Sequence, residues 1–548
     1  MPPTAGPLDP LEEEVVRHVF ELYPSYAVSL GRHEYDGRTM PADRASTDTW
    51  LAEAEALLSR LRAIPATELS EERRHDRFLL ELLLEGPRFD LAEVGELERN
   101  PMAYLSSLSL TSYIARPYAP AAVRAEGIIA LLRGIPRLLD TATRRLCPVL
   151  PRPFVSLAVS MGRGLPASFD EAAAFVAAEA PAASGEFRDA RRSAEEALGR
   201  FVGWLESDRL PRADEGFALG PARFQRLLWV REGLETPWEE IEATGRADLA
   251  RNQARLAQIA RQEERTIPTL LDEIAADHPT AEELVPTARA LVEEARSFVV
   301  GHALATVPKE ARARVEPTPA WGRSLSTASM DSPGPFEPGE GEGIYYVTPV
   351  DPAWTPEQRE EWLRSLNRTM LANITVHEVY PGHYLQFLAF RRAPLSLARR
   401  AYLSPSFVEG WAHYAEQLAI EEGYGAPSHR AEVAQIHDAL LRDCRLLAAI
   451  GLHARGWGVA EATSLFQREA HFEALPAQRE AIRGTFNPEY FCYTLGKLAI
   501  LSARDRHLRR TFGGSLRAFH DALLGLGCPP IGRLDALLGG GAMPTGPR

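Results

Sequence analysis

The sequence of 548 residues is 45% hydrophobic and 25% charged, which is the composition of an ordinary globular protein with a large core. Its formal net charge is −14 and it contains no basic block, which argues against a nucleic-acid partner. The 4 cysteines form no Cys-x-x-Cys pair, so the sequence favours neither a disulfide framework nor a thiolate metal site.

The N-terminal residues, Met1 to Glu14, lack both the basic region and the apolar stretch that make up a secretory signal peptide. No apolar run in the sequence approaches the length of roughly 18 residues that a membrane-spanning helix needs. We therefore expect a cytoplasmic protein without a membrane partner.

The N-terminal part of the chain shows the spacing of apolar side chains that is typical of amphipathic helices. Residues 1–314 are therefore predicted to form a helical N-terminal part, and residues 315–548 the part that carries the chemistry. The two parts together are expected to form one continuous fold. In the first part we expect helices over residues 8–30, 47–65, 69–86, 120–147, 167–207, 238–277 and 280–302.

Residues 315–343 are rich in proline, glycine and serine, which predicts a loop. The segment that follows, residues 344–349, is the best strand candidate because it begins with β-branched and aromatic residues. Such a strand could offer its edge to an extended peptide, with Tyr346 as a substrate contact. The alternative is a structural hairpin.

Thr355, Pro356 and Gln358 are the residue types of a helix start: a capping threonine, a proline at the first position and a glutamine that completes a capping box. This helix is expected to continue through Ile374 to residue 378. The fold class is mainly α-helical with one small β-sheet near the site. Further helices are predicted from residue 382 to before Pro394, from residue 404 onward, and over residues 428–455, 459–471, 475–484, 488–510 and 515–524.

A His-Glu pair and a second histidine lie within seven residues, at His377, Glu378 and His383. Zinc hydrolases use neutral imidazoles to hold the metal ion, and a carboxylate beside the first ligand accepts a proton from a metal-activated water. The stretch resembles the His-Glu-x-x-His signature, except that the second histidine follows the first by six residues instead of four. We therefore take His377 and His383 as candidate zinc ligands and Glu378 as the candidate general base.

The spacing of six residues requires a break in the helix, because residues six apart in an unbroken helix are turned by about 120° from each other. Pro381 and Gly382 lie between the two histidines. Proline cannot donate a hydrogen bond to the preceding turn, and glycine relaxes the backbone. A break at this point would bring His383 back toward His377. The alternative is that one helix ends here and His383 caps the next, with no metal involved.

A third ligand is needed, and a fourth position must stay open for water. Glu409 is the candidate, because it lies on a later helix whose apolar residues indicate burial. Glu409, His413 and Glu416 lie four and three residues apart, on one face of that helix. Burying these polar side chains costs free energy unless they have partners. A metal ion would be such a partner, and His413 and Glu416 would then lie behind the ligands. The alternative is that Glu409 closes a capping box with Ser406.

Four residues further along the chain are candidates for contacting the substrate or for stabilising negative charge on its carbonyl oxygen. His453 could donate a hydrogen bond to that oxygen, although a single histidine on a helix is more often structural. The hydroxyl of Tyr493 could do the same, and its alternative is a place in the core. Arg445 and Lys497 suit the binding of a peptide carboxylate.

The motifs in this part of the chain resemble those of the bacterial "domain of unknown function 885" family. Similar motifs near the N-terminus are Leu30-Gly31-x-His33-x-Tyr35-Asp36-Gly37 and Asn100-Pro101-x-x-Tyr104, so the resemblance covers nearly the whole chain. The motifs around the site are His377-Glu378-x-x-Pro381-Gly382-His383-x-x-Gln386, Glu409-Gly410-Trp411-Ala412-x-Tyr414-x-Glu416, Gly451-Leu452-His453-x-x-Gly456-Trp457 and Tyr493-x-x-Gly496.

The resemblance implies a mostly helical fold of the zincin metallopeptidase type, related to the gluzincins, which hold zinc with two histidines and one glutamate. It places the metal ligands at His377, His383 and Glu409 and the general base at Glu378. One departure is Ala449, which stands where the family often has an acidic residue. A contact that such a carboxylate would make is therefore not expected here.

These features together predict a zinc-dependent hydrolase, in the first place a peptidase that cleaves short peptides with a metal-activated water. Hydrolysis of a non-peptide amide would use the same groups. An iron oxygenase also uses two histidines and one carboxylate, but the adjacent Glu378 and the helical frame argue against it. A non-catalytic binding protein that retains the fold would not need a base beside the ligands. The oligomeric state does not follow from the sequence.

Overall fold

The computed structural model describes residue 6 and residues 8–319, 323, 326–337, 339, 342–510 and 514–539. The chain divides into two compact units. Unit 1 consists of Met1–Phe217, Pro333–Gly341 and Leu395–Tyr402, and unit 2 of Ala218–Ser332, Glu342–Pro394 and Leu403–Arg548. Residues 218–314, which the sequence assigned to the N-terminal part, thus lie in the same unit as the predicted metal ligands.

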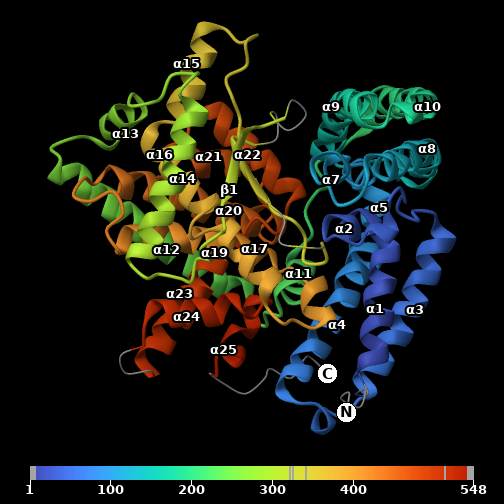
Figure 1. The fold of residues 1–548 in the computed structure, drawn as a ribbon, viewed down its shortest axis with the longest axis horizontal. Coiled ribbons are helices and arrows are strands. Elements are labelled where there is room, and N and C mark those ends of the chain that lie inside the picture. The colour runs from blue at the N-terminus through green and yellow to red at the C-terminus, as the bar shows by residue number, and fades with distance from the viewer. Residues whose placement is uncertain are drawn as a thin grey trace. The chain divides into compact units, whose positions relative to one another are not determined.

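Unit 1 is built of helices, and its α10 lies alongside both α8 and α9 (Figure 1). The sequence predicts one helix over residues 167–207. The structure instead has α9 and α10, separated at Ala180 and Pro181, because proline lacks the N–H that would continue α9. The α-helices of this unit are α1 (Asp9–Leu22), α2 (Pro24–Ser29), α3 (Arg44–Ala63), α4 (Glu71–Arg88), α5 (Glu96–Arg99), α6 (Met102–Ser106), α7 (Thr111–Ala115), α8 (Ala121–Arg145), α9 (Arg152–Glu179), α10 (Ser184–Trp204) and α18 (Leu397–Ala401).

Unit 2 combines most of the remaining helices with one small sheet, which confirms the predicted fold class. Among the described residues, no helix is both long and apolar enough to cross a membrane. Its α-helices are α11 (Pro221–Glu232), α12 (Trp238–Gln262), α13 (Ile267–Ala275), α14 (Leu284–Gly301), α15 (Pro356–Ser365), α16 (Arg368–Glu378), α17 (His383–Arg392), α19 (Pro405–Glu421), α20 (Arg430–His453), α21 (Val459–Glu469), α22 (Ala474–Phe486), α23 (Cys492–Arg510), α24 (Leu516–Leu524) and α25 (Leu534–Leu537).

The sheet has the strand order β1-β3-β2, with β1 parallel and β2 antiparallel to β3. The strands are β1 (Ala313–Pro317), β2 (Ala328–Asp331) and β3 (Gly343–Val347). Only β3 is predicted by the sequence, because β1 ends in a proline and β2 is short and partly polar. The predicted loop over residues 315–343 therefore contains part of β1 and all of β2, and its residues 320–322, 324–325, 338 and 340–341 lie outside the described residues.

Two shorter helices replace the long helix that the sequence predicts from Thr355 to residue 378. The predicted cap is confirmed, since Thr355 and Gln358 form a capping box with Pro356 at the first position. The helix α15 then ends at Ser365, and the side chain of Asn367 accepts a hydrogen bond from the N–H of Met370 to begin α16. This second cap begins α16, and the C-terminal end of α16 carries the His-Glu pair.

The helices that meet around this end of α16 are among the most buried parts of unit 2. Trp411 and Tyr414 on α19 are fully buried. The helix α19 packs against α16 and α23, and α20 packs against α12 and α16 (Figure 1). Polar side chains of α16, α19 and α20 contact one another inside this unit.

Candidate metal centre

The backbone turns sharply between α16 and α17, as the proline and glycine predict. The N–H of Gly382 donates to the carbonyl of Val376 over 3.0 Å. A Cβ on Gly382 would lie 1.7 Å from the carbonyl oxygen of His377, so only glycine fits this turn. The turn brings the rings of His377 and His383 to a centroid distance of 4.8 Å, with their planes at 87°. The predicted approach of the two histidines is confirmed, although each lies in its own helix.

Glu409 on α19 completes a group of three possible ligands. Its Oε2 lies 3.5 Å from the Nε2 atoms of both His377 and His383. One ligand atom from each residue falls within 4.8 Å of the others, a separation that one metal ion could bridge. The alternative role of Glu409 in a capping box with Ser406 is wrong, because the side chain of Ser404 caps α19.

Each histidine uses its second ring nitrogen for a contact with a neighbouring side chain. Nδ1 of His377 lies 2.6 Å from Oε1 of Glu416, and Nδ1 of His383 lies 3.4 Å from Oε1 of Gln386. An acceptor at Nδ1 fixes the tautomer of the imidazole and leaves the Nε2 lone pair free to bind a metal ion. Glu416 thus lies behind His377, one of the possible ligands.

The carboxylates make this pocket attractive to positive charge. Burial alone lowers the pKa of His377, but hydrogen bonds to Glu409 and Glu416 outweigh it and raise that pKa to about 10. Burial alone raises the pKa of Glu409, but its contacts with His377 and His383 hold that pKa well below the usual value. A cation at the centre of the group would balance the carboxylate of Glu409.

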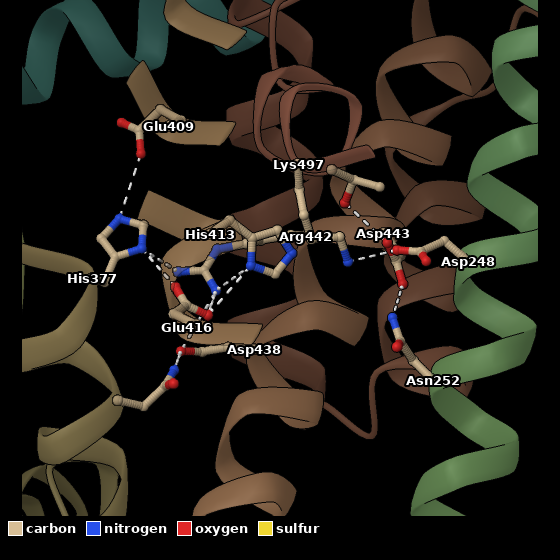
Figure 2. Close-up of polar contacts among 12 residues, drawn as sticks. Asp248, Asn252, His377, Glu409, His413, Glu416, Asp438, Arg442, Asp443 and Lys497 are labelled. Atoms are coloured by element: carbon tan, nitrogen blue, oxygen red, sulfur yellow. Dashed lines mark hydrogen bonds and ion pairs between the residues drawn. The ribbon is translucent and has the colours of Figure 1, made fainter. Parts of the chain in front are cut away.

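Glu416 is also held by two residues other than His377, as Figure 2 shows. The guanidinium of Arg442 on α20 donates to Oε2 of Glu416 over 2.8 Å, and Nδ1 of His413 lies 3.3 Å from the same oxygen. Burial raises the pKa of Glu416, but the charge of Arg442 and the nearby His413 hold that pKa well below its usual value. Glu416 is therefore a fixed anion behind His377. The sequence reasoning placed His413 in this region and did not assign Arg442 a role.

The carboxyl group of Glu378 lies beside the three possible ligands. Burial raises its pKa, while the adjacent His377 and His383 oppose that rise and Glu409 adds to it. The backbone N–H of Met330 on β2 interacts with the same carboxyl group. A raised pKa brings a glutamate closer to the range in which a general base works near neutral pH.

The crossing of α19 and α23 places Tyr493 beside the same group. A Cβ on Gly496 would lie 1.7 Å from the carbonyl oxygen of Ser406, and a Cβ on Gly410 would lie 2.5 Å from Cα of Gly496. The two glycines thus allow the helices to touch, one turn from Tyr493 and next to Glu409. Burial, together with the negative charge of Glu409, raises the pKa of Tyr493, so its hydroxyl keeps its proton. No hydrogen bond to that hydroxyl is present among the described residues.

Arg445 and Lys497 are both engaged with carboxylates of other helices. Arg445 binds Glu480 through two hydrogen bonds of 2.8 and 2.9 Å, and its guanidinium lies 5.2 Å from the ring centre of Tyr493. The fully buried Lys497 donates to Asp248 over 2.7 Å (Figure 2). These contacts support a role in positioning helices and Tyr493, and they leave the predicted binding of a substrate carboxylate without support.

The remaining two predicted residues lie in different surroundings. Nε2 of His453 lies 2.8 Å from the carbonyl oxygen of Gly484, and its ring stacks on Phe224. That nitrogen is therefore already occupied, so Tyr493 is the better candidate for a hydrogen-bond donor in the site. Tyr346 lies on the central strand β3, opposite Glu316 and Ser329, and is partly exposed.

The family comparison agrees with the motifs. The model of the family described as "Bacterial protein of unknown function (DUF885)" matches residues 24–538. The chain belongs to this family. None of the curated proteins matches the sequence.

Two solved structures resemble this chain over nearly its whole length. One, from Shewanella oneidensis, is described as a "putative lipoprotein of unknown function"; it is 23% identical, with 98% of this chain and 100% of that chain covered and a TM-score of 0.81. The other, the "putative lipoprotein" from Colwellia psychrerythraea, is 16% identical, with 98% and 99% covered and a TM-score of 0.79. At these identities the likeness establishes a shared fold.

Sequence reasoning missed two contributors to the site. Arg442 has Asp438 one helical turn before it, so the sequence offered a local partner and did not indicate the contact with Glu416. Met330 contributes a backbone N–H, for which no side-chain pattern exists. Both reach the site from segments that are distant from His377 in the sequence.

Proposed function

We propose that the protein is a zinc-dependent peptidase that cleaves short peptides. The observation that carries the proposal is the convergence of His377, His383 and Glu409 on one point, with the carboxyl group of Glu378 beside it. Binding alone would require the three ligands. The additional Glu378 is the group that hydrolysis requires.

The donor set suits zinc. Two imidazole nitrogens and one carboxylate oxygen are the ligands of many catalytic zinc sites, and they leave a position open for water or substrate. The contacts of Glu416 and Gln386 with the Nδ1 atoms support binding through both Nε2 atoms. A zinc ion held there would supply Lewis-acid activation of a water molecule and of the substrate carbonyl.

Each of the neighbouring side chains then has a defined task. Glu378 would accept a proton from the attacking water and pass it to the leaving amine. The hydroxyl of Tyr493 would donate a hydrogen bond to the carbonyl oxygen as negative charge develops on it. Glu416, held by Arg442, would keep the ring of His377 in its orientation.

A peptide is favoured over another amide by the position of β2. This strand lies at the edge of the sheet, and the backbone N–H of Met330 interacts with the carboxyl group of Glu378. A strand at the edge of a sheet, close to a reacting group, suits an extended peptide backbone, which would pair with it through main-chain hydrogen bonds. The helical frame with a small sheet beside the metal helix also supports a zincin type of fold.

The direct test is cleavage of a mixed library of short peptides, followed by mass spectrometry. We expect the wild type to cleave peptides and Glu378→Gln to lose turnover while it keeps its metal. Glu361→Gln, an exposed substitution on α15, is the matched control and is expected to cleave like the wild type. Cleavage by Glu378→Gln at the wild-type rate would overturn the general-base role. Hydrolysis of non-peptide amides alone would make this an amidase.

A further inference from the structure

A groove of about 740 Å³ opens in unit 2 beside the helix that carries the His-Glu pair. It is lined by residues of α13, α15, α16, α20 and α21, by the segment between α21 and α22, and by Thr327 just before β2. None of the three possible metal ligands lines it. The groove is therefore a separate space, and its relation to Glu378 has to follow from the elements that it shares with the metal centre.

The first shared element is α16. Asn367, Met370 and Ile374 line the groove, and Glu378 follows one turn after Ile374. These positions are spaced by three or four residues, so they form one stripe along a single face of the helix. The helix face that lines the groove therefore continues to Glu378, which lies about 6 Å beyond Ile374 along the helix axis.

The second shared element is the edge strand. Thr327 lines the groove and immediately precedes β2, and Met330 on this strand reaches Glu378 through its backbone N–H. The segment that contains Thr327 and β2 therefore also connects the wall of the groove to Glu378. A peptide backbone that follows the edge of β2 away from Glu378 would enter the groove.

The third connection is a chain of charged side chains. Asp438 lines the groove, and it lies 3.7 Å from Arg442, which binds Glu416 behind the ligand His377 (Figure 2). Asp438 also accepts a hydrogen bond of 2.8 Å from the amide of Asn373 on α16. These contacts fix the position of the groove wall relative to the metal centre.

The surface of the groove that a ligand could contact is mostly apolar. Asp272 is paired with Arg364, and Asp438 is engaged by Asn373 and Arg442. The lining also contains Glu473, and its apolar surface comes from side chains such as Leu271, Ile374 and Phe472. Binding of an apolar side chain to this surface is favourable, because it removes apolar atoms from water.

We infer that this groove binds an apolar side chain of the peptide substrate, at a position about two residues from the bond that is cleaved. The distance of about 6 Å along α16 corresponds to about two residues of an extended chain, at roughly 3.3 Å each. This inference rests on the proposed peptidase function and names its substrate class: short peptides with a leucine, methionine or phenylalanine on one side of the scissile bond.

The experiment compares kcat/KM for a series of peptides that differ only at that position, from glycine through alanine and leucine to phenylalanine. Ala275→Trp narrows the groove from α13, and Ile374→Ala widens it from α16. Ala276→Trp is the matched control, because Ala276 is the exposed next residue and does not line the groove. Equal metal content in all proteins shows that the metal centre is intact.

We expect the wild type to prefer leucine or phenylalanine over glycine at least tenfold. Ala275→Trp should lose this preference through a higher KM while its kcat on the alanine peptide stays within about twofold, and Ile374→Ala should shift the preference to phenylalanine. Cleavage with a preference that neither variant alters would overturn the groove as a subsite and leave the peptidase proposal standing. Failure of the wild type to cleave any peptide would overturn both.

Discussion

Nδ1 of His377 lies 2.6 Å from Oε1 of Glu416, and the other oxygen of that carboxylate is held by Arg442 over 2.8 Å. The contact joins a residue at the end of α16 to the interior of α19. It fixes the orientation of an imidazole whose Nε2 faces Glu409. A hydrogen bond of this kind behind a metal ligand sets both the tautomer and the basicity of the ligand.

Glu416→Gln tests this relationship. The amide can still occupy the space, but it loses the charge that orients His377 and balances Arg442, so we expect metal affinity to fall about 10- to 100-fold. Competition with a chromophoric chelator measures the change. Glu421→Gln, on an exposed turn of the same helix, should bind metal like the wild type. Equal affinities for all three proteins would show that Glu416 does not support the ligand.

Gly496→Ala tests the crossing of α19 and α23. The added methyl group would meet the carbonyl oxygen of Ser406, and we expect overpacking to cost about 1–3 kcal/mol of unfolding free energy. The control is Gly301→Ala on α14, where a Cβ meets nothing within 4 Å. Denaturant unfolding of the two variants should separate them clearly. Similar midpoints would mean that the helices can move apart without cost.

Tyr493→Phe removes only a hydroxyl. If that hydroxyl donates to the developing oxyanion, kcat should fall about 10²- to 10³-fold with little change in metal content or stability. Tyr424→Phe removes a buried hydroxyl elsewhere in unit 2 and should keep full activity. If the kcat of Tyr493→Phe equalled that of the wild type, Tyr493 would have only a structural role.

Glu232→Gln tests a pH dependence of stability. Burial raises the pKa of Glu232 from 4.5 to about 7, against the hydrogen bonds that it accepts from Ser404, Ser406 and Ile531. Because the folded state holds the proton more tightly, the contribution of Glu232 to stability is complete below pH 4.5 and is lost as the pH rises through about 7.

The corresponding measurement is the urea midpoint at a series of pH values from below 4.5 to above 7. Over this range the wild type should lose stability relative to Glu232→Gln, whose side chain cannot ionise. Parallel profiles for the two proteins would contradict the raised pKa.

Local chemistry made much of the site predictable. Pro381 and Gly382 predicted the break that brings His383 back to His377, and the spacing along α19 placed Glu409 and Glu416 on one face. The capping box at Thr355 gave the start of α15. Each of these inferences depends on residues within one or two turns of each other, where backbone geometry alone decides which atoms can meet.

Contacts between distant segments were not predictable in the same way. The end of α15 was missed because its stop depends on the cap at Asn367, without a proline or glycine nearby. Lys497 was taken for a substrate contact, whereas Asp248 on α12 binds it. The partner of a buried charge is chosen by tertiary packing, which leaves no pattern around the charge itself.

The metal content of protein purified without added metal, measured by elemental mass spectrometry, tests the central claim most directly. We predict about one zinc ion per chain in the wild type and a large loss of zinc in Glu409→Ala, with Glu421→Gln retaining it. A wild type without bound metal, or a Glu409→Ala protein that binds as much zinc as the wild type, would contradict the proposed centre.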